Sequence, residues 1–141
     1  SLTQYMNEKL WSQIGTEYPA RWSIDQQKGG MEKAFSSINA TARDFAKFGR
    51  LYLHHGNWNG KQLISKDWVQ ESTKATSQEG AVSYYQYQWW LPTKTGDFMA
   101  NGHLGQYIYV NPAKDLIIVR LGKNEGKVSW WQAFLEIAAQ L

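Results

Sequence analysis

The sequence of 141 residues contains no cysteine, only three prolines and few charged side chains. Without cysteine, disulfides, thiol catalysis and thiolate metal sites are excluded. Fifteen basic residues against twelve acidic ones give a net charge of +3, too small and too evenly spread to predict nucleic-acid binding. No apolar run approaches the ~18 residues that a membrane span requires. We therefore expect one ordinary domain with a hydrophobic core, no nucleic-acid partner and no membrane span.

Histidine is also scarce, and the first residues do not have the pattern of an export signal. His54 and His55 adjoin each other beside a glycine and have no carboxylate at metal-ligand spacing, so we expect no metal site. No basic segment followed by an apolar one opens the chain. An export signal would have to precede residue 1, and a periplasmic or secreted location is expected only if the parent protein carries one.

Aromatic residues, in contrast, are abundant, with eight tryptophans and eight tyrosines. Such a density is typical of large cores, ligand walls or interfaces. The run "YYQYQWW", together with Trp58 and Trp68, could form a platform for sugar rings. An aromatic-rich carbohydrate-binding or protein-interaction module is therefore one hypothesis for the function.

The first 37 residues predict a helix followed by a loop. Leu2, Tyr5, Met6 and Leu10 lie at helical spacing, and Gly15 is a stop signal. Residues 16–37 are irregular and polar, with a proline and two adjacent glycines. Long loops inside compact domains often carry function.

Two further helices are predicted in the first half. Thr41 followed three residues later by Asp44 is a capping-box pattern, and the helix that it opens is expected to end at Gly56. An Asn-Gly turn at residues 59–60 precedes Ser65, which is expected to cap a short helix.

From residue 83 the apolar pattern changes to a period of two. Residues 84–91 and 106–111 alternate as strands do, and an Asn-Pro turn leads into the almost continuously apolar residues 116–121. This last run is expected to be a central strand buried on both faces. A final helix capped by Ser129 is expected to cover the sheet through a stripe formed by Trp131, Phe134, Leu135 and Ala138.

The predicted fold class is therefore α+β, with helices followed by a small antiparallel sheet of about three strands under a C-terminal helix. An unpaired edge is a liability in so small a sheet, so oligomers could form through the exposed edge.

The sequence lacks the motifs that would identify a complete serine hydrolase. No serine is followed by lysine three residues later, and no Gly-x-Ser-x-Gly elbow occurs. We therefore predict no catalytic residue in this chain. A literal Lys-Thr-Gly triplet stands at residues 94–96, but "PTKTGD" is dense in turn residues and favours a turn.

Three stretches carry a family resemblance: residues 29–69, "YQYQWWLP" and "NGHLGQYIYVNPAKDLIIVRLG". They resemble the C-terminal part of the serine β-lactamase-like hydrolases, in the branch with 6-aminohexanoate-dimer hydrolases, family VIII-type esterases and penicillin-binding-protein-like hydrolases. The resemblance implies cleavage of a small amide or ester through an acyl-serine, without a cofactor. It also implies that the Ser-x-x-Lys and Tyr-x-Asn elements precede the matched region.

The resemblance thus predicts that residues 1–141 are a single C-terminal segment of a larger hydrolase. Residues 1–82 would be its mainly helical and loop part, and residues 83–141 its last strands and terminal helix. The segment is expected to be inactive alone, and its partner would be the missing N-terminal part of the same hydrolase.

What would remain of the site is the family's third motif, on the strand that lines the cleft. In one register, His103-Leu104-Gly105 takes the place of Lys-Thr-Gly, with the Gln106 N–H towards the oxyanion. In the other, residues 100–102 form the triplet, and His103 offers its own N–H. The substrate-binding or oxyanion wall is predicted to comprise Asn101, Gly102, His103, Leu104, Gly105 and Gln106.

Overall fold

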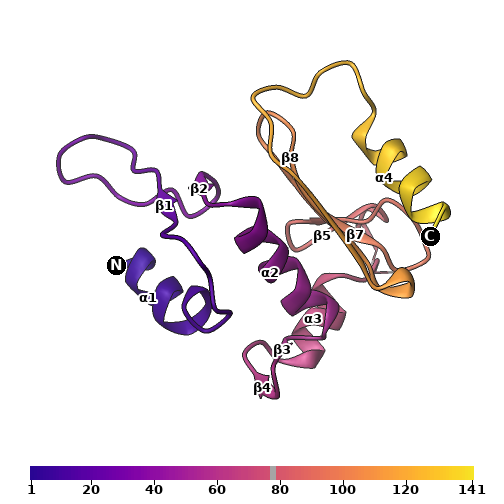
Figure 1. Cartoon of the computed structure of the whole chain (residues 1–141), viewed down its shortest axis with the longest axis horizontal. Helices are drawn as coiled ribbons and strands as arrows, with labels where there is room; N and C mark the ends of the chain where they lie inside the picture. The colour runs from indigo at the N-terminus through magenta and orange to yellow at the C-terminus, as the bar shows by residue number, and fades with distance from the viewer. Residues whose placement is uncertain (77–78) are drawn as a thin grey trace.

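The computed structural model describes residues 1–76 and 79–141, and its centre is an antiparallel sheet between two helices. The sheet has the order β5-β6-β7-β8-β9, and its strands are Tyr85–Gln86, Trp89–Trp90, Phe98–Gly102, Gln106–Asn111 and Leu116–Arg120. Helix α2 (Ala42–Leu53) packs on one face and α4 (Trp130–Ala139) on the other (Figure 1). The predicted α+β class is confirmed.

Smaller elements surround this centre. Helix α1 (Leu2–Met6) continues into the π-helix η1 (Asn7–Trp11), and α3 (Lys66–Ser72) follows α2. Two short hairpins pair β1 (Arg21–Trp22) with β2 (Ile38–Asn39) and β3 (Asn57–Trp58) with β4 (Lys61–Gln62). A 3₁₀ turn, η2 (Pro112–Lys114), joins β8 to β9. In Figure 1, α1 and β1 lie on the side of α2 away from the sheet, and β2 leads into the start of α2.

The sheet has five strands rather than the expected three, because residues 84–91 form two strands instead of one and Phe98–Gly102 forms a strand that was not predicted. Tyr87 and Gln88 have φ values of 43° and 73°, and the chain reverses there between β5 and β6. Two successive left-handed residues make the tight turn that suits a two-residue hairpin, usually with Asn or Gly. Tyr-Gln is not a turn signal, so the alternating pattern predicted one strand instead of two.

The apolar run at residues 116–121 is also placed differently from the prediction, since β9 is an edge strand and β8 is the inner one. Both faces of β9 are nevertheless covered. Ile117 and Val119 pack in the cluster under α2, and Leu116 and Ile118 pack in the cluster under α4. A continuous apolar run thus indicates that both faces of a strand are buried, and does not indicate whether the strand is central or at an edge of the sheet.

The opening helix buries only part of the predicted stripe, since Met6 and Leu10 pack against a core cluster. The Leu2 and Tyr5 side chains are 36% and 63% exposed, whereas Trp11 and Ile14 are buried. The reason is the π-helical turn at Asn7–Trp11, which breaks the 3.6-residue period on which the prediction depended. At the other end of the chain, Ser129 precedes α4 but its side chain makes no capping hydrogen bond.

Helix α2 is anchored by a buried carboxylate at its N-terminus. As predicted, Thr41 is the N-cap, and its hydroxyl accepts a hydrogen bond from the Asp44 N–H at 3.2 Å. The Asp44 carboxylate in turn accepts the N–H groups of Glu17 at 2.8 Å and Tyr18 at 3.3 Å. A capping-box acid therefore also fixes the loop that follows η1.

The electrostatics of Asp44 favour the charged form. Burial by itself would raise the pKa of this carboxyl, because a charge is costly away from water. The hydrogen bonds from Glu17, Thr41 and Tyr18 and the Lys47 ammonium 3.7 Å away outweigh burial, and the pKa lies below its ordinary value. Asp44 is thus an ionised group inside the protein, held by donors from two segments.

Helix α2 approaches the sheet closely at Gly49. A Cβ atom there would lie 3.0 Å from Ile108 Cγ2 and 3.1 Å from Ile117 Cγ2. These methyl groups belong to β8 and β9, so the glycine sets the distance between the helix and two strands.

We expect Gly49→Val to destabilise the fold by about 2 kcal/mol, because overpacking a close contact forces side chains and backbone apart. The free energy of unfolding in urea measures the effect. Ala42→Val provides a control on an exposed position of the same helix, where only helix propensity changes. A Gly49→Val protein as stable as Ala42→Val would contradict the close packing.

Candidate functional site

The predicted site residues lie at one end of the β7–β8 hairpin. Asn101 and Gly102 end β7, Gln106 begins β8, and Gly102 pairs with Gln106. The three residues between them form the turn, in which Leu104 and Gly105 have φ values of 63° and 75°. Of the two predicted triplets, residues 100–102 are therefore extended, whereas residues 103–105 are the turn itself.

A cavity of about 830 Å³ lies against this end of the hairpin. Four of the six predicted residues line it: Gly102, His103, Leu104 and Gln106. Asn101 and Gly105 are not among the lining residues. The structure therefore brings most of the predicted wall to one hollow, to which Ser23, residues within 35–45 and residues 121–123 also contribute.

The other walls come from residues that the sequence did not indicate. Residues 35–40 and Phe45 form one wall, and residues 121–123 another. Ser36 and Ser37 lie on the first, with their hydroxyl oxygens 2.9 Å apart, and Ser37 has a φ of 71°. The sequence signals for this wall were the long loop at residues 16–37 and the resemblance over residues 29–69, and neither gives a position within it.

The cavity is chemically neutral to basic. Among its lining residues only His103 and Lys123 can carry a positive charge, and none is acidic. Phe35, Phe45 and Leu104 add apolar surface. Such a lining suits a ligand with an apolar body that carries no positive charge near this wall.

Backbone donors are available at the edge of the cavity. Among the described residues, none accepts a hydrogen bond from the N–H of His103 or of Leu104. The Gln106 side chain, in contrast, is occupied, because its Oε1 accepts the Gly122 N–H at 3.0 Å and its Nε2 donates to the Gly122 carbonyl. The turn can therefore offer main-chain N–H groups to a ligand, while Gln106 ties the hairpin to the next loop.

The literal Lys-Thr-Gly triplet is a structural turn at the other end of β7. Gly96 has a φ of 99°, and the Thr95 hydroxyl donates to Asp97 at 2.9 Å. The buried Asp97 carboxylate also accepts the Tyr109 hydroxyl at 2.5 Å. Burial and this hydrogen bond raise the pKa of Tyr109 to about 12. The predicted turn is confirmed, and its polar groups serve a buried network.

The spelling Tyr-x-Asn occurs twice, although the resemblance places that motif upstream. Tyr5 and Asn7 lie in the opening helix, where the tyrosine is largely exposed. Tyr109 and Asn111 lie in β8, and both contact Asp97. Neither tyrosine lines the 830 Å³ cavity, so neither has the position of a catalytic group there.

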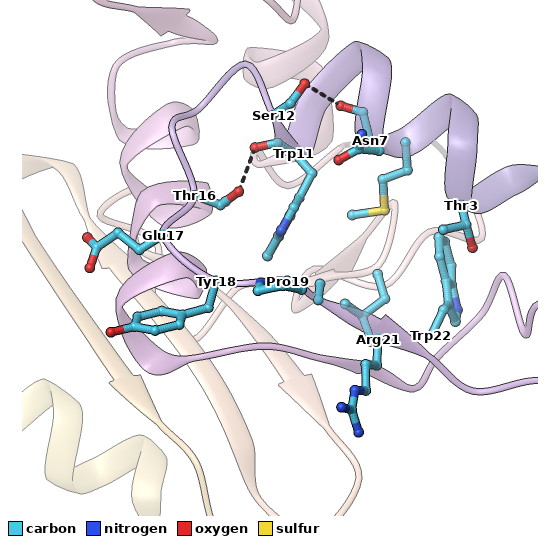
Figure 2. A pocket seen from close by; sticks show the side chains of 13 residues that line it. Thr3, Asn7, Trp11, Ser12, Thr16, Glu17, Tyr18, Pro19, Arg21 and Trp22 are labelled. Carbon is cyan, nitrogen blue, oxygen red and sulfur yellow. Dashed lines mark hydrogen bonds between the residues drawn. The ribbon is translucent and has the colours of Figure 1, made fainter.

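A second cavity of about 510 Å³ lies between the opening helices and residues 16–22 (Figure 2). Its walls are mainly apolar, and the Trp11 ring extends toward Pro19. The Ser12 and Thr16 hydroxyls donate to the carbonyls of Asn7 and Trp11 at 2.7 and 3.1 Å. The Trp11 Nε1 has no partner among the described residues and is itself covered by protein atoms. None of the predicted wall residues lines this cavity.

The described part of the chain has neither a cluster of metal-ligating side chains nor a membrane-spanning helix. No three or more His, Asp or Glu side chains lie close enough together there to hold a metal ion. No helix of residues 1–76 and 79–141 is long and apolar enough to cross a bilayer.

Comparison with known proteins gives consistent results. The profile of the family described as Beta-lactamase matches residues 4–129. The chain is 31% identical over 123 residues to the 6-aminohexanoate-dimer hydrolase of Paenarthrobacter ureafaciens, a match that covers 79% of this chain and 31% of that protein.

Solved structures extend the comparison to the fold. "Putative 6-aminohexanoate-dimer hydrolase from Bacillus anthracis" superposes with a TM-score of 0.84 and 33% identity over 99% of this chain and 38% of that one. A "putative beta-lactamase from Bacteroides dorei" gives 0.69 and 14% over 97% and 51%, a likeness of fold alone. The chain thus spans about a third of the length of the two 6-aminohexanoate-dimer hydrolases, from Paenarthrobacter ureafaciens and Bacillus anthracis.

Proposed function

Because the chain belongs to the beta-lactamase family, we propose that it forms one wall of the acyl-transfer site of a serine hydrolase that cleaves a small amide or ester. The observation that carries the proposal is the 830 Å³ cavity, whose edge is a turn with main-chain N–H groups that no described residue accepts. Such groups stabilise the negative oxygen that forms when a nucleophile attacks a carbonyl.

In the proposed reaction, the serine and lysine lie outside residues 1–141, and this chain supplies the hydrogen-bond donor for the oxyanion. A serine activated by a lysine, in the Ser-x-x-Lys arrangement that residues 1–141 lack, attacks the substrate carbonyl. The carbonyl oxygen gains the negative charge, and the His103 N–H donates a hydrogen bond to it. The bond to the amine or alcohol breaks, the leaving group takes a proton, and water then hydrolyses the acyl-serine. In this scheme the chain alone is inactive.

Of the two possible registers, we favour the one in which residues 100–102 form the triplet. Its support is that these residues are extended at the end of β7, so they can lie along a substrate as a strand does. His103 then follows, and its N–H donates to no other residue of 1–76 and 79–141. The other triplet contains two successive left-handed residues and offers no extended segment. With Ala100 first, the favoured triplet has no cation, which suits a substrate without a carboxylate at that position.

The alternative of an aromatic sugar-binding module is not favoured by the ring positions. Trp58 lies under the Arg50 guanidinium, with the Cζ atom 4.3 Å from its ring centroid. Trp68 packs against Tyr87 at 4.9 Å, and Trp89 is buried in the core. Trp58 and Trp89 therefore serve separate packing contacts, and the partly exposed Trp68 and Tyr87 contact each other rather than either of those two rings.

A serine-directed fluorophosphonate probe tests the proposed function. We expect the complete hydrolase, of which residues 1–141 are one part, to be labelled on a serine outside residues 1–141. Residues 1–141 alone should stay unlabelled. Replacement of the labelled serine by alanine is the control. Labelling of a serine within residues 1–141, or no labelling of the complete hydrolase, would overturn the proposal.

A further inference from the structure

Arg120, the last residue of β9, connects the turn at residues 103–105 to two other segments. Its Nη1 donates a hydrogen bond to the Gly105 carbonyl, and its Nη2 donates to the Asn124 carbonyl at 2.9 Å. The guanidinium carbon lies 4.0 Å from the centroid of the Trp130 ring, at the start of α4. One side chain therefore holds the turn, the loop after β9 and the last helix together.

The loop after β9 is also held by side chains other than Arg120, namely those of Trp130 and Gln106. The Trp130 Nε1 donates to the Glu125 carbonyl at 2.6 Å. The Gln106 side chain exchanges two hydrogen bonds with the backbone of Gly122. The Arg120 guanidinium thus bonds to a loop with its own anchors, so it can restrain the turn.

Two glycines lie against the guanidinium, so a side chain on either one would displace the tip of Arg120. A Cβ atom on Gly105 would lie 2.6 Å from Arg120 Nη1, and one on Gly122 would lie closer still. Gly105 also has the left-handed backbone that glycine adopts most readily. Gly105 and Gly122 therefore leave open the space that the Arg120 guanidinium occupies.

The turn needs an external restraint. Leu104 is a non-glycine residue with a φ of 63°, a conformation unfavourable for a side chain with a Cβ. Its exposed side chain is not packed in the core. A charge-assisted hydrogen bond to the Gly105 carbonyl fixes the end of the turn.

We propose that Arg120 is a positioning residue, which holds the turn so that the His103 N–H keeps the place required for oxyanion binding. This inference rests on the proposed function for its catalytic meaning, but the restraint itself does not. Because a donor misplaced by about 1 Å can cost about 10²-fold in rate, a loosened turn should lower kcat. Arg120 itself would not touch the substrate, since it is not among the residues that line the cavity.

Backbone ¹⁵N relaxation of the complete hydrolase, measured at residues 103–105, tests the restraint without any activity. We expect order parameters near ~0.85 at residues 103–105, and values below ~0.6 in Arg120→Ala. Arg120→Lys keeps the charge but cannot bridge two carbonyls in a planar fork, so it should be intermediate. It also replaces the alanine variant if that protein does not fold.

Arg50→Ala is the matched control. Arg50 also stacks on a tryptophan, Trp58, and donates to Asn59 at 3.4 Å, but it lies on α2 and does not line the cavity. It should leave the order parameters at residues 103–105 unchanged. Equal values in the wild-type and both Arg120 variants would overturn the restraint.

Kinetics of the complete hydrolase then separate the restraint from the chemistry. Arg120→Ala should lower kcat at least ~10-fold with little change in KM, and Arg50→Ala should alter neither. A mobile turn with an unchanged kcat would overturn the catalytic role of the turn and leave the restraint standing. Failure of the fluorophosphonate labelling would overturn the proposed function and leave the relaxation result unaffected.

Discussion

Replacement of His103 by proline is expected to lower kcat of the complete hydrolase by about 10²–10³-fold, the loss typical of removing one oxyanion donor. Proline has no N–H, so the variant removes the donor that the favoured register assigns to residue 103. His103→Ala keeps this N–H and is expected to retain kcat within a few-fold. The pair of variants therefore separates the backbone of residue 103 from its imidazole.

Steady-state kinetics on a small ester or amide give the result, with circular dichroism to show that both variants fold. If proline disturbs the turn, an amide-to-ester replacement at residue 103 removes the N–H without a ring. A loss in His103→Ala as large as in the proline variant would favour the other register, in which the imidazole is the polar group. Full activity in both variants would exclude residue 103 from the site.

Asp44→Ala is expected to lower the free energy of unfolding by about 3 kcal/mol, the size typical of leaving buried polar groups without their charged partner. The Asp44 side chain is fully buried, and its removal leaves the N–H groups of Glu17 and Tyr18 and the Thr41 hydroxyl without their acceptor. Denaturation in guanidinium chloride at neutral pH measures the change. Both the N-terminus of α2 and the loop after η1 depend on this carboxylate.

The pH dependence of Asp44 has a definite sign. Its folded-state pKa is lowered, so its stabilising contribution is present above the ordinary aspartate pKa and is lost as the pH falls through the lowered value. Asp44→Ala should therefore flatten the acid limb of the stability curve. Glu17→Gln is the control, since it alters the exposed pair with Lys47 and keeps the backbone N–H that Asp44 accepts. Equal losses in the two variants would contradict the role of Asp44.

Features that depend on a few neighbouring residues could be predicted from the sequence. The Thr41 cap is present, and the Ser65 hydroxyl accepts the Trp68 N–H at 3.2 Å. Asn59 and Gly60 have the left-handed φ values of a two-residue hairpin turn. Each of these features is decided by local backbone geometry, to which one or two side chains contribute most of the preference.

The arrangement of the sheet could not be predicted in the same way. Neither Tyr87 nor Gln88 favours a left-handed backbone, so the sequence gives no sign of the turn between β5 and β6. The contact between Tyr87 and Trp68 of α3 forms only in the folded protein. The outer place of β9 could not be inferred either, because α2 and α4 cover both faces of an edge strand as they would those of an inner one.

The sequence by itself determined the caps at Thr41 and Ser65, the α+β class, the family resemblance and the part of the chain, residues 101–106, where a site was to be sought. Only the tertiary structure decided which segments face that hairpin, because residues 35–40 and 121–123 carry no local pattern that points to it. The same holds for Arg120, which lies fifteen residues from Gly105 in the chain and contacts it only because β8 and β9 pair. Local preferences act over a few residues, whereas a cavity depends on packing between distant segments, and that packing is a property of the whole chain.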